Sequence, residues 1–206
     1  MAANQVVTNT NDSGAGSLRQ AIIDVISGGE ITFSVTGTIT LTSGELAIDK
    51  DMTITGPGAD VLSIDGNASS RIFEIGTSST NPTVTITGLT ITNGSVSDDG
   101  GGIYNYSDNL SLENCTISGN SANYGGGMYN NGYHDQCNPT LTNCTISGNS
   151  ASSWGGGMYN NGYWGHCSPT LTNCIISGNS AAWGGGMFNN AHLGSCGTTQ
   201  INCTIS

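Results

Sequence analysis

The fold is decided by the stretch Leu141-Thr-Asn-Cys-Thr-Ile-Ser-Gly-Asn-Ser-Ala, which is followed by Gly155-Gly-Gly-Met-Tyr-Asn-Asn. The same cycle starts again at Leu171, and its glycine triplets begin at Gly125, Gly155 and Gly184. The repeat is therefore 30 and then 29 residues long. A period this constant predicts a solenoid, because one unit cannot bury its apolar face alone and must stack on a copy of itself.

Within one repeat, short runs alternate apolar and polar residues, which is the pattern of β-strands. Three runs are expected, at 155–160 with Met158 inward, at 169–172 with Leu171 inward, and at 174–176 with Cys174 and Ile176 inward. Three strands in each repeat predict an all-β fold, a parallel β-helix solenoid. Helical solenoids are excluded, because the glycine triplets and the β-branched residues disfavour helices.

An asparagine stands between the second and third runs of every repeat. Leu171 and Cys174 are three positions apart, so the alternation changes phase and the chain must bend at Asn173. The bends are expected to stack into a ladder of hydrogen-bonded amides. Its members are Asn114, Asn143, Asn173 and Asn202.

The first 30 residues differ from the rest and are expected to form a cap. Apolar residues at positions 18, 22, 25 and 26 have helical spacing, with Ser17 as N-cap and Gln20 placed as in a capping box. Gly28-Gly29 is expected to end this short helix. The predicted organisation is a cap over 1–30, irregular β-helix coils over 31–99 and regular repeats over 100–206.

Two segments carry a resemblance to known proteins. Asp12-Ser-Gly-Ala-Gly-Ser-Leu-Arg-Gln-Ala-Ile, followed by Ile31-Thr-Phe, resembles the N-terminal segment of bacterial extracellular right-handed β-helix proteins. Asn143-Cys-Thr-Ile-Ser-Gly-Asn-Ser-Ala with Gly155-Gly-Gly-Met-Tyr-Asn is similar to the repeats of polymorphic outer membrane protein-type adhesins. The resemblance implies a right-handed, pectin-lyase-like β-helix that is secreted or attached to the cell surface, with an adhesive or structural role.

The chain is poor in charged residues. Of its 206 residues 8% are charged, the formal net charge is -11, and the basic residues are Arg19, Lys50 and Arg71. Nucleic acid is not an expected partner, because phosphate binding needs clustered Lys and Arg. No apolar run reaches the roughly 20 residues that span a bilayer, so membrane insertion is not expected. The Asn-rich, Lys-poor surface favours an extracellular or cell-surface location, and Met1-Ala2-Ala3 is interpreted as a start that replaces a removed leader.

Seven cysteines fall into two files with one member in each repeat. The first file is Cys115, Cys144, Cys174 and Cys203, and the second is Cys137, Cys167 and Cys196. A disulfide between Cys137 and Cys144 is excluded, because roughly five extended residues of about 3.3 Å each exceed the permitted Cα separation of about 7 Å. The favoured prediction is a buried ladder of thiols. If disulfides form, Cys137–Cys167 in stacked loops is the first choice.

The spacing of the histidine, cysteine and aspartate residues gives little support for a metal site. The histidines His134, His166 and His192 stand three, one and four residues from the nearby cysteine, whereas a repeated zinc site would keep its register. Calcium is an alternative at Asp98-Asp99 or at Asp49 and Asp51, although the glycine-aspartate nonapeptide is absent. We expect no cofactor, with calcium kept as the alternative.

The acidic residues do not predict an enzyme. Glycoside hydrolysis needs two carboxyl groups on one face, whereas Asp135 is the only acid from Cys115 to Ser206, a segment without Lys or Arg. One cluster in the early coils could be catalytic, but it is interpreted more simply as solvated turn residues beside a surface ion pair. Its members are Asp60, Asp65, Arg71 and Glu74. No catalytic residue is expected.

Aromatic residues recur in register and are expected to form outward files. Such files suit sugar rings or another protein surface, and the alternative is that the rings stack on one another and stiffen the solenoid. One file is Tyr104, Tyr129, Tyr159 and Phe188; a second is Tyr124, Trp154 and Trp183; Tyr133 and Tyr163 lie in the long loops. The expected ligand or interface residues are Tyr124, Trp154, Trp183, Tyr129, Tyr159, Phe188 and Tyr163.

The expected function is structural or adhesive, with self-association or other surface proteins as partners. The sequence ends within a repeat at Cys203-Thr-Ile-Ser206, and an open coil invites head-to-tail pairing into fibres. A carbohydrate-binding or polysaccharide-processing β-helix, with neutral glycans as ligands, is the alternative. Ice binding is a second alternative, on the outward file Thr116, Thr145, Ile175 and Thr204, which isoleucine interrupts.

Overall fold

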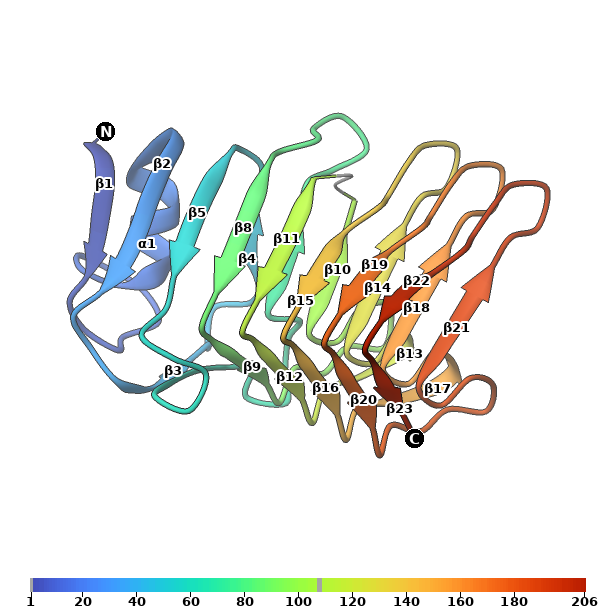
Figure 1. The fold of residues 1–206 in the computed structure, drawn as a ribbon. Helices are drawn as coiled ribbons and strands as arrows, with labels where there is room; N and C mark the ends of the chain where they lie inside the picture. The colour runs from blue at the N-terminus through green and yellow to red at the C-terminus, as the bar shows by residue number, and fades with distance from the viewer. Residues whose placement is uncertain (1, 107–108) are drawn as a thin grey trace.

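The computed structural model describes residues 2–106 and 109–206, and over these residues the chain winds into a β-helix (Figure 1). Neighbouring coils pair only through parallel strands, and the strands gather into three long sheets that run along the solenoid. The predicted all-β parallel β-helix with three strands per coil is therefore confirmed. Among the described residues, no helix has the length and hydropathy needed to cross a bilayer.

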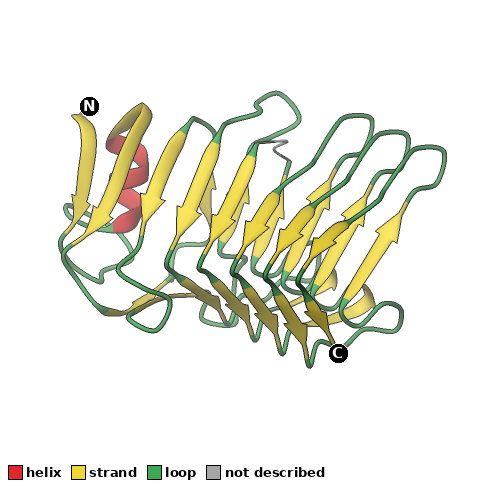
Figure 2. Cartoon of the chain, in the orientation of Figure 1, coloured by secondary structure: helices red, strands yellow, loops and turns green. Residues whose placement is uncertain are grey.

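Each long sheet takes one strand from nearly every coil (Figure 2). The first sheet contains β1 (Ala2–Val7), β2 (Val25–Phe33), β5 (Met52–Thr55), β8 (Val84–Thr87), β11 (Leu110–Glu113), β15 (Thr140–Thr142), β19 (Thr170–Thr172) and β22 (Thr199–Ile201). The second contains β3 (Gly37–Thr40), β6 (Leu62–Asp65), β9 (Thr90–Thr92), β12 (Thr116–Ser118), β16 (Thr145–Ser147), β20 (Ile175–Ser177) and β23 (Thr204–Ile205). The third contains β4 (Leu46–Ile48), β7 (Phe73–Ile75), β10 (Ile103–Asn105), β14 (Met128–Asn131), β18 (Met158–Asn161) and β21 (Met187–Asn190).

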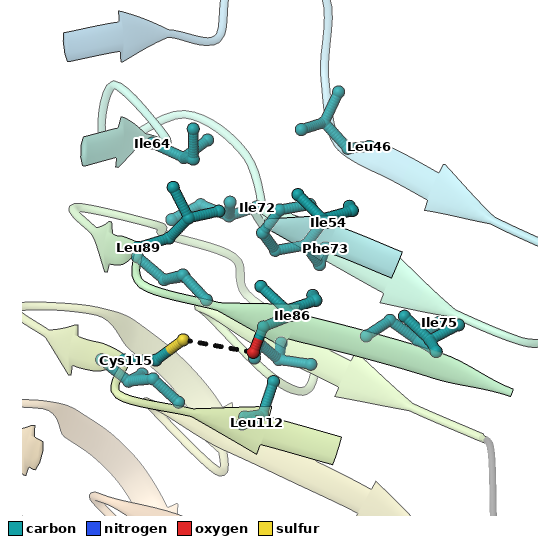
Figure 3. Close-up of a cluster of buried hydrophobic side chains, with 14 of the residues drawn as sticks. Leu46, Ile54, Ile64, Ile72, Phe73, Ile75, Ile86, Leu89, Leu112 and Cys115 are labelled. Atoms are coloured by element: carbon teal, nitrogen blue, oxygen red, sulfur yellow. Dashed lines mark hydrogen bonds between the residues drawn. The ribbon is translucent and has the colours of Figure 1, made fainter. Parts of the chain in front are cut away.

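The core lies inside the coils and is built from stacked equivalents. Ile91, Ile117, Ile146 and Ile176 stand opposite one another on four successive coils, and all four are fully buried. Burial of one such side chain contributes about 1.5–3 kcal/mol, so this file of identical residues stabilises each interface between these four coils. In Figure 3 the larger side chain of Phe73 fills the same interior among Ile54, Ile75 and Ile86.

The N-terminal cap contains helix α1 (Leu18–Asp24), which packs beside β1, β2 and β4. The Ser17 hydroxyl oxygen accepts a hydrogen bond from the backbone N–H of Gln20 at 3.2 Å, as expected of an N-cap. The side chain of Gln20 does not complete a capping box, because it donates to Asp24 Oδ1 at 3.0 Å. Because β1 pairs with β2, the cap adds a strand to the first sheet as well as a helix.

The prediction that Gly28-Gly29 ends this helix is wrong. Val25 already has an extended backbone, with φ -62° and ψ 139°, and it begins β2. Val25 and Ile26 are β-branched and favour a strand, so the helix stops before them. Gly29 has a different role, because a Cβ at this position would overlap the carbonyl oxygen of Ala3 on β1.

A fourth, short sheet was not expected from the sequence. It consists of β13 (Ser121–Tyr124) and β17 (Ser150–Trp154), which pair in parallel with a register shift between Ala122 and Tyr124. The sequence analysis placed no strand in these segments. They lengthen the path between the second and third sheets and bring Tyr124 and Trp154 beside the third sheet.

Candidate binding surface

A stack of aromatic rings follows the outer face of the third sheet. Tyr104, Tyr129, Tyr159 and Phe188 occupy equivalent positions on β10, β14, β18 and β21. Successive ring centroids are 4.9, 5.0 and 5.7 Å apart, with interplanar angles of 22° or less. Each tyrosine hydroxyl accepts a hydrogen bond from an asparagine of the next coil, as Tyr129 does from Asn161 at 3.0 Å. The stacked rings and their hydrogen bonds therefore stabilise the packing of neighbouring coils.

Most of this stack is covered. Tyr124 of β13 lies 5.6 Å from the ring of Tyr159, and Trp154 of β17 lies 5.3 Å from the ring of Phe188. As a result only 7% of Tyr129 and 4% of Tyr159 is exposed, and burial raises the pKa of both hydroxyls. The expectation that Tyr129 and Tyr159 face a ligand is wrong, because the unexpected short sheet shields them. Trp183, in register with Trp154, is 66% exposed.

A charged cluster lies at the N-terminal end of the aromatic stack. The buried Arg71 guanidinium donates to Glu45 Oε2 at 2.7 Å and to the backbone carbonyl of Asp99 at 2.7 Å, and it lies 4.9 Å above the Tyr104 ring. Glu74 is the neighbour of Tyr104 on β7. Burial, and then the Glu45 carboxylate, raises the pKa of Glu74. Among the described residues, Arg71 thus pairs with the carboxylate of Glu45 alone, and its charge also acts on the carboxyl groups of Glu74 and Asp99.

This cluster differs from the one considered from the sequence. Arg71 and Glu74 do belong to it, but Asp65 lies on the second sheet, where it pairs with Thr92 and receives a hydrogen bond from Asn93 at 2.9 Å. Asp60 is exposed in the loop before β6. Glu45 and Asp99 take part instead, because the coils before and after Arg71 bring them to it. Asp60 and Asp65 therefore cannot act with Glu74.

Asp99 is expected to make the protein sensitive to pH. Burial, and then the Asp98 carboxylate, raises the pKa of Asp99 from 3.8 to about 6, against the lowering effect of Arg71. Its Oδ1 atom is buried without a hydrogen-bond partner. Because the folded-state pKa is above the unfolded value, the protonated form stabilises the fold fully below about pH 4, and this stability is lost as the pH rises through about 6.

The substitution Asp99→Asn should therefore stabilise the protein at about pH 8, where the carboxylate is ionised. After allowance for partial exposure, the expected gain in unfolding free energy is on the order of 1–2 kcal/mol. Urea titrations at pH 4 and pH 8 would measure it, and Asp98→Asn is the matched control with a smaller expected gain. Identical pH profiles for Asp99→Asn and the unchanged protein would contradict this account.

Further exposed aromatic side chains stand on the long loops that follow β14, β18 and β21 (upper right of Figure 1). These loops stack in register through backbone hydrogen bonds such as Trp164 N–H to the His192 carbonyl at 3.2 Å. Their side chains form two files, Tyr133–Tyr163–His192 and His134–Trp164–Leu193, which we call the loop ridge. Stacked centroids are 5.0–6.1 Å apart. Tyr133 and Trp164 are 49% and 50% exposed.

The backbone of the loop ridge is strained at the same position in each loop. His134, Trp164 and Leu193 have φ values of 59°, 58° and 58°, in the left-handed region. A bulky side chain there costs roughly 1–2 kcal/mol, and glycine or asparagine would avoid that cost. Large side chains are nevertheless present and point to solvent. Strain kept at one place in three coils marks this position as a candidate functional site.

A hollow opens beside the loop ridge, between the loop after β7 and the loop after β14. Its volume is about 420 Å³. It is lined by Thr77, Ser78, Tyr106, Asn131, Tyr133, His134 and Asp135. Hydroxyl, amide, imidazole and carboxyl groups therefore converge next to two tyrosine rings, a combination that fits a small polar ligand with an apolar face.

The histidines and cysteines take different places. His134 and His192 belong to the loop ridge, and the ring of His166 hydrogen-bonds the Ser195 hydroxyl. Within the described residues, no three His, Cys, Asp or Glu side chains converge as a metal-binding group. Five of the seven cysteines are buried, namely Cys115, Cys137, Cys144, Cys167 and Cys174, and Cys196 and Cys203 are partly exposed.

Three asparagine ladders run along the solenoid, of which the sequence analysis named one. Asn143 and Asn173 donate to Asn114 and Asn143 at 3.2 Å, and these residues and Asn202 have left-handed backbones at the bend. A second ladder, Asn105–Asn130–Asn160–Asn189, lies mostly buried along the inner face of the third sheet. A third, Asn120–Asn149–Asn179, connects the turns after the second sheet. The second and third ladders could have been predicted from the sequence, because their asparagines recur at the same spacing in every repeat.

These observations define a parallel β-solenoid whose inner face is structural and whose candidate binding groups stand on its loops. The chain belongs to the right-handed β-helix family, since the family model for a right handed beta helix region matches residues 38–205. No curated protein matches the chain. Among solved structures, a chain described as Geobacillus virus E2 ORF18 is similar at 14% identity and a TM-score of 0.33; the alignment covers 97% of this chain and 60% of the viral chain.

Proposed function

We propose that this protein is an extracellular or cell-surface adhesive module that binds neutral carbohydrate through the loop ridge. The observation that carries the proposal is the strained, exposed placement of Trp164 and its equivalents His134 and Leu193. Within each file the rings stack on one another, so they offer solvent a row of ring edges in register at the spacing of the coils. Sugars pack apolar C–H groups against such an aromatic surface, while the hollow supplies hydrogen-bond groups for the hydroxyls.

The charges favour a neutral ligand over an anionic one. The chain carries a net charge of -11, and no Lys or Arg follows Arg71. An acidic polysaccharide would be repelled by this field and would find no cation on the loops. Among the described residues that line the hollow beside the loop ridge, Asp135 is the one acid, and glycoside hydrolysis needs a pair of carboxyl groups. Binding without turnover is the proposed activity.

Isothermal titration calorimetry would test the proposal with soluble oligomers of glucose, mannose, galactose and N-acetylglucosamine. The variant Trp164→Asn keeps a residue that tolerates the left-handed backbone and removes the ring. Combined with Tyr133→Ala, it should weaken binding by at least about tenfold, which corresponds to about 1.4 kcal/mol.

The matched control is Trp183→Ala, which removes an indole that is 66% exposed and lies outside the loop ridge. It should leave the affinity unchanged. The proposal is wrong if none of the four oligomers binds, or if the control weakens binding as much as the loop-ridge variant does. Release of reducing ends from a bound oligomer would contradict the non-catalytic role.

A further inference from the structure

The outer face of the first sheet carries two neighbouring files of threonine. In each strand the residues on either side of the inward residue point outward, as Thr140 and Thr142 do around Leu141 on β15. Register aligns these pairs over successive coils. One file is Thr53, Thr85, Ser111, Thr140, Thr170 and Thr199; the other is Thr55, Thr87, Glu113, Thr142, Thr172 and Ile201. We call these two files together the threonine array.

The threonine array is regular in two dimensions. From β5 to β22 the strands pair in parallel without a register shift. Equivalent groups therefore repeat at about 4.8 Å between coils and at about 6.6 Å along each strand. The buried amide ladders hold the coils in this register, so the spacing is rigid. Figure 1 shows the strands of this sheet side by side along the whole solenoid.

Most hydroxyls of the threonine array are available to a ligand, although that of Thr55 donates to Glu30 Oε1 at 2.8 Å. Within the described residues, those of Thr85, Thr87 and Thr142 make no hydrogen bond to the rest of the chain. Thr140 donates only to the neighbouring array member Ser111, at 3.3 Å. Glu113 is the one charged member from β5 to β22, in a chain of net charge -11. From β5 to β22 the array thus carries a single charged side chain, and Glu30 on the adjacent strand β2 adds a second at its edge.

We propose that the threonine array binds the surface of ice. Each threonine offers a hydroxyl that bonds water and a methyl group that water does not solvate, and both recur at constant spacing. Water molecules in ice occupy a lattice with fixed repeats of similar size, so a rigid, uncharged array holds a layer of water in matching order. Bridging water contributes nearly as much enthalpy as a direct hydrogen bond.

The geometry assigns this role to the first sheet rather than to the outward file of the second sheet considered from the sequence. In that file Ile175 lacks a hydroxyl, and the adjacent outward file of the same sheet contains the charged Asp65, in register with Thr92. The first sheet has four complete threonine pairs, on β5, β8, β15 and β19. The proposal is independent of the loop ridge, which lies on other residues.

Ice-recrystallisation inhibition and thermal hysteresis of the full chain would test the proposal. The unchanged protein should slow recrystallisation relative to a serum albumin solution of equal mass concentration. The variant Thr142→Tyr with Thr172→Tyr places two large rings on the threonine array and should abolish the activity. The matched control Thr145→Tyr places a ring on the outer face of the second sheet and should keep it. Circular dichroism of each variant excludes unfolding as the cause.

A variant expected to gain ice-binding activity provides a second test of the proposal. Ser111→Thr with Glu113→Thr completes the threonine pairs from β5 to β19 and should raise the thermal hysteresis above that of the unchanged protein. If the unchanged protein and this completed variant both leave ice growth unaffected, the proposal is wrong. It is also wrong if Thr145→Tyr removes as much activity as the double tyrosine variant.

Discussion

Gly126→Ala is expected to lower the unfolding free energy by about 3 kcal/mol or more, because the added methyl group has no space. A Cβ at this position would overlap the carbonyl oxygen of Ser150 and lie 2.7 Å from that of Gly156. Both belong to the next coil, whose backbone cannot retreat without breaking the short sheet. For a chain of this size the change corresponds to a fall in Tm of roughly 6–12 °C.

Thermal unfolding followed by circular dichroism would measure this effect. Gly197→Ala is the matched control, because nothing lies within 4 Å of a Cβ built at that position. It should change the Tm little. The same close approach recurs at Gly101 and Gly156, against Ser121 and Ser180. If Gly126→Ala unfolds at the same temperature as Gly197→Ala, the second glycine of the triplet does not serve close packing.

Asn149→Ala is expected to cost about 3–4 kcal/mol, since it leaves buried polar groups without partners. Asn149 is 1% exposed. Its Oδ1 accepts from the backbone N–H of Asn120 at 3.0 Å, and its Nδ2 donates to the Ile117 carbonyl at 2.9 Å and to Asn179 Oδ1 at 3.0 Å. The substitution therefore removes the hydrogen bonds of the ladder to both neighbouring asparagines, Asn120 and Asn179.

Chemical denaturation of Asn149→Ala beside Asn143→Gly would separate a buried ladder from an exposed one. Asn143 lies in the exposed ladder with φ 54°, a conformation that glycine adopts without strain. Its amide bonds compete with water, so the expected loss is below about 1 kcal/mol. Equal losses for the two variants would show that burial does not decide the contribution of these amides.

Much of the solenoid could be predicted from the sequence, because the pattern of apolar and polar residues within one repeat indicates which residues point inward and where the chain bends. Met158, Leu171, Cys174 and Ile176 were predicted to point inward, and all four are buried. The bend at Asn173 follows from one break in alternation, and its φ is 54°. These features depend on neighbours within one repeat, and each copy supplies the same pattern again.

The candidate sites were less accessible to sequence reasoning. Tyr129 and Tyr159 carry the pattern of outward residues, yet the short sheet covers them, and no alternation marks β13 or β17. Trp164 was overlooked because its equivalents are His134 and Leu193, which share a backbone conformation and not a residue type.

The sequence by itself determined the class of fold, the strand positions and the inward residues, because stacking identical units turns periodicity directly into structure. Only the tertiary structure decided which outward side chains meet. Glu45, Arg71, Glu74 and Asp99 gather from three coils, and the two threonine files become one array only through the register between strands. Such contacts join residues about one repeat apart, and their geometry depends on loop length and register, which local pattern does not encode.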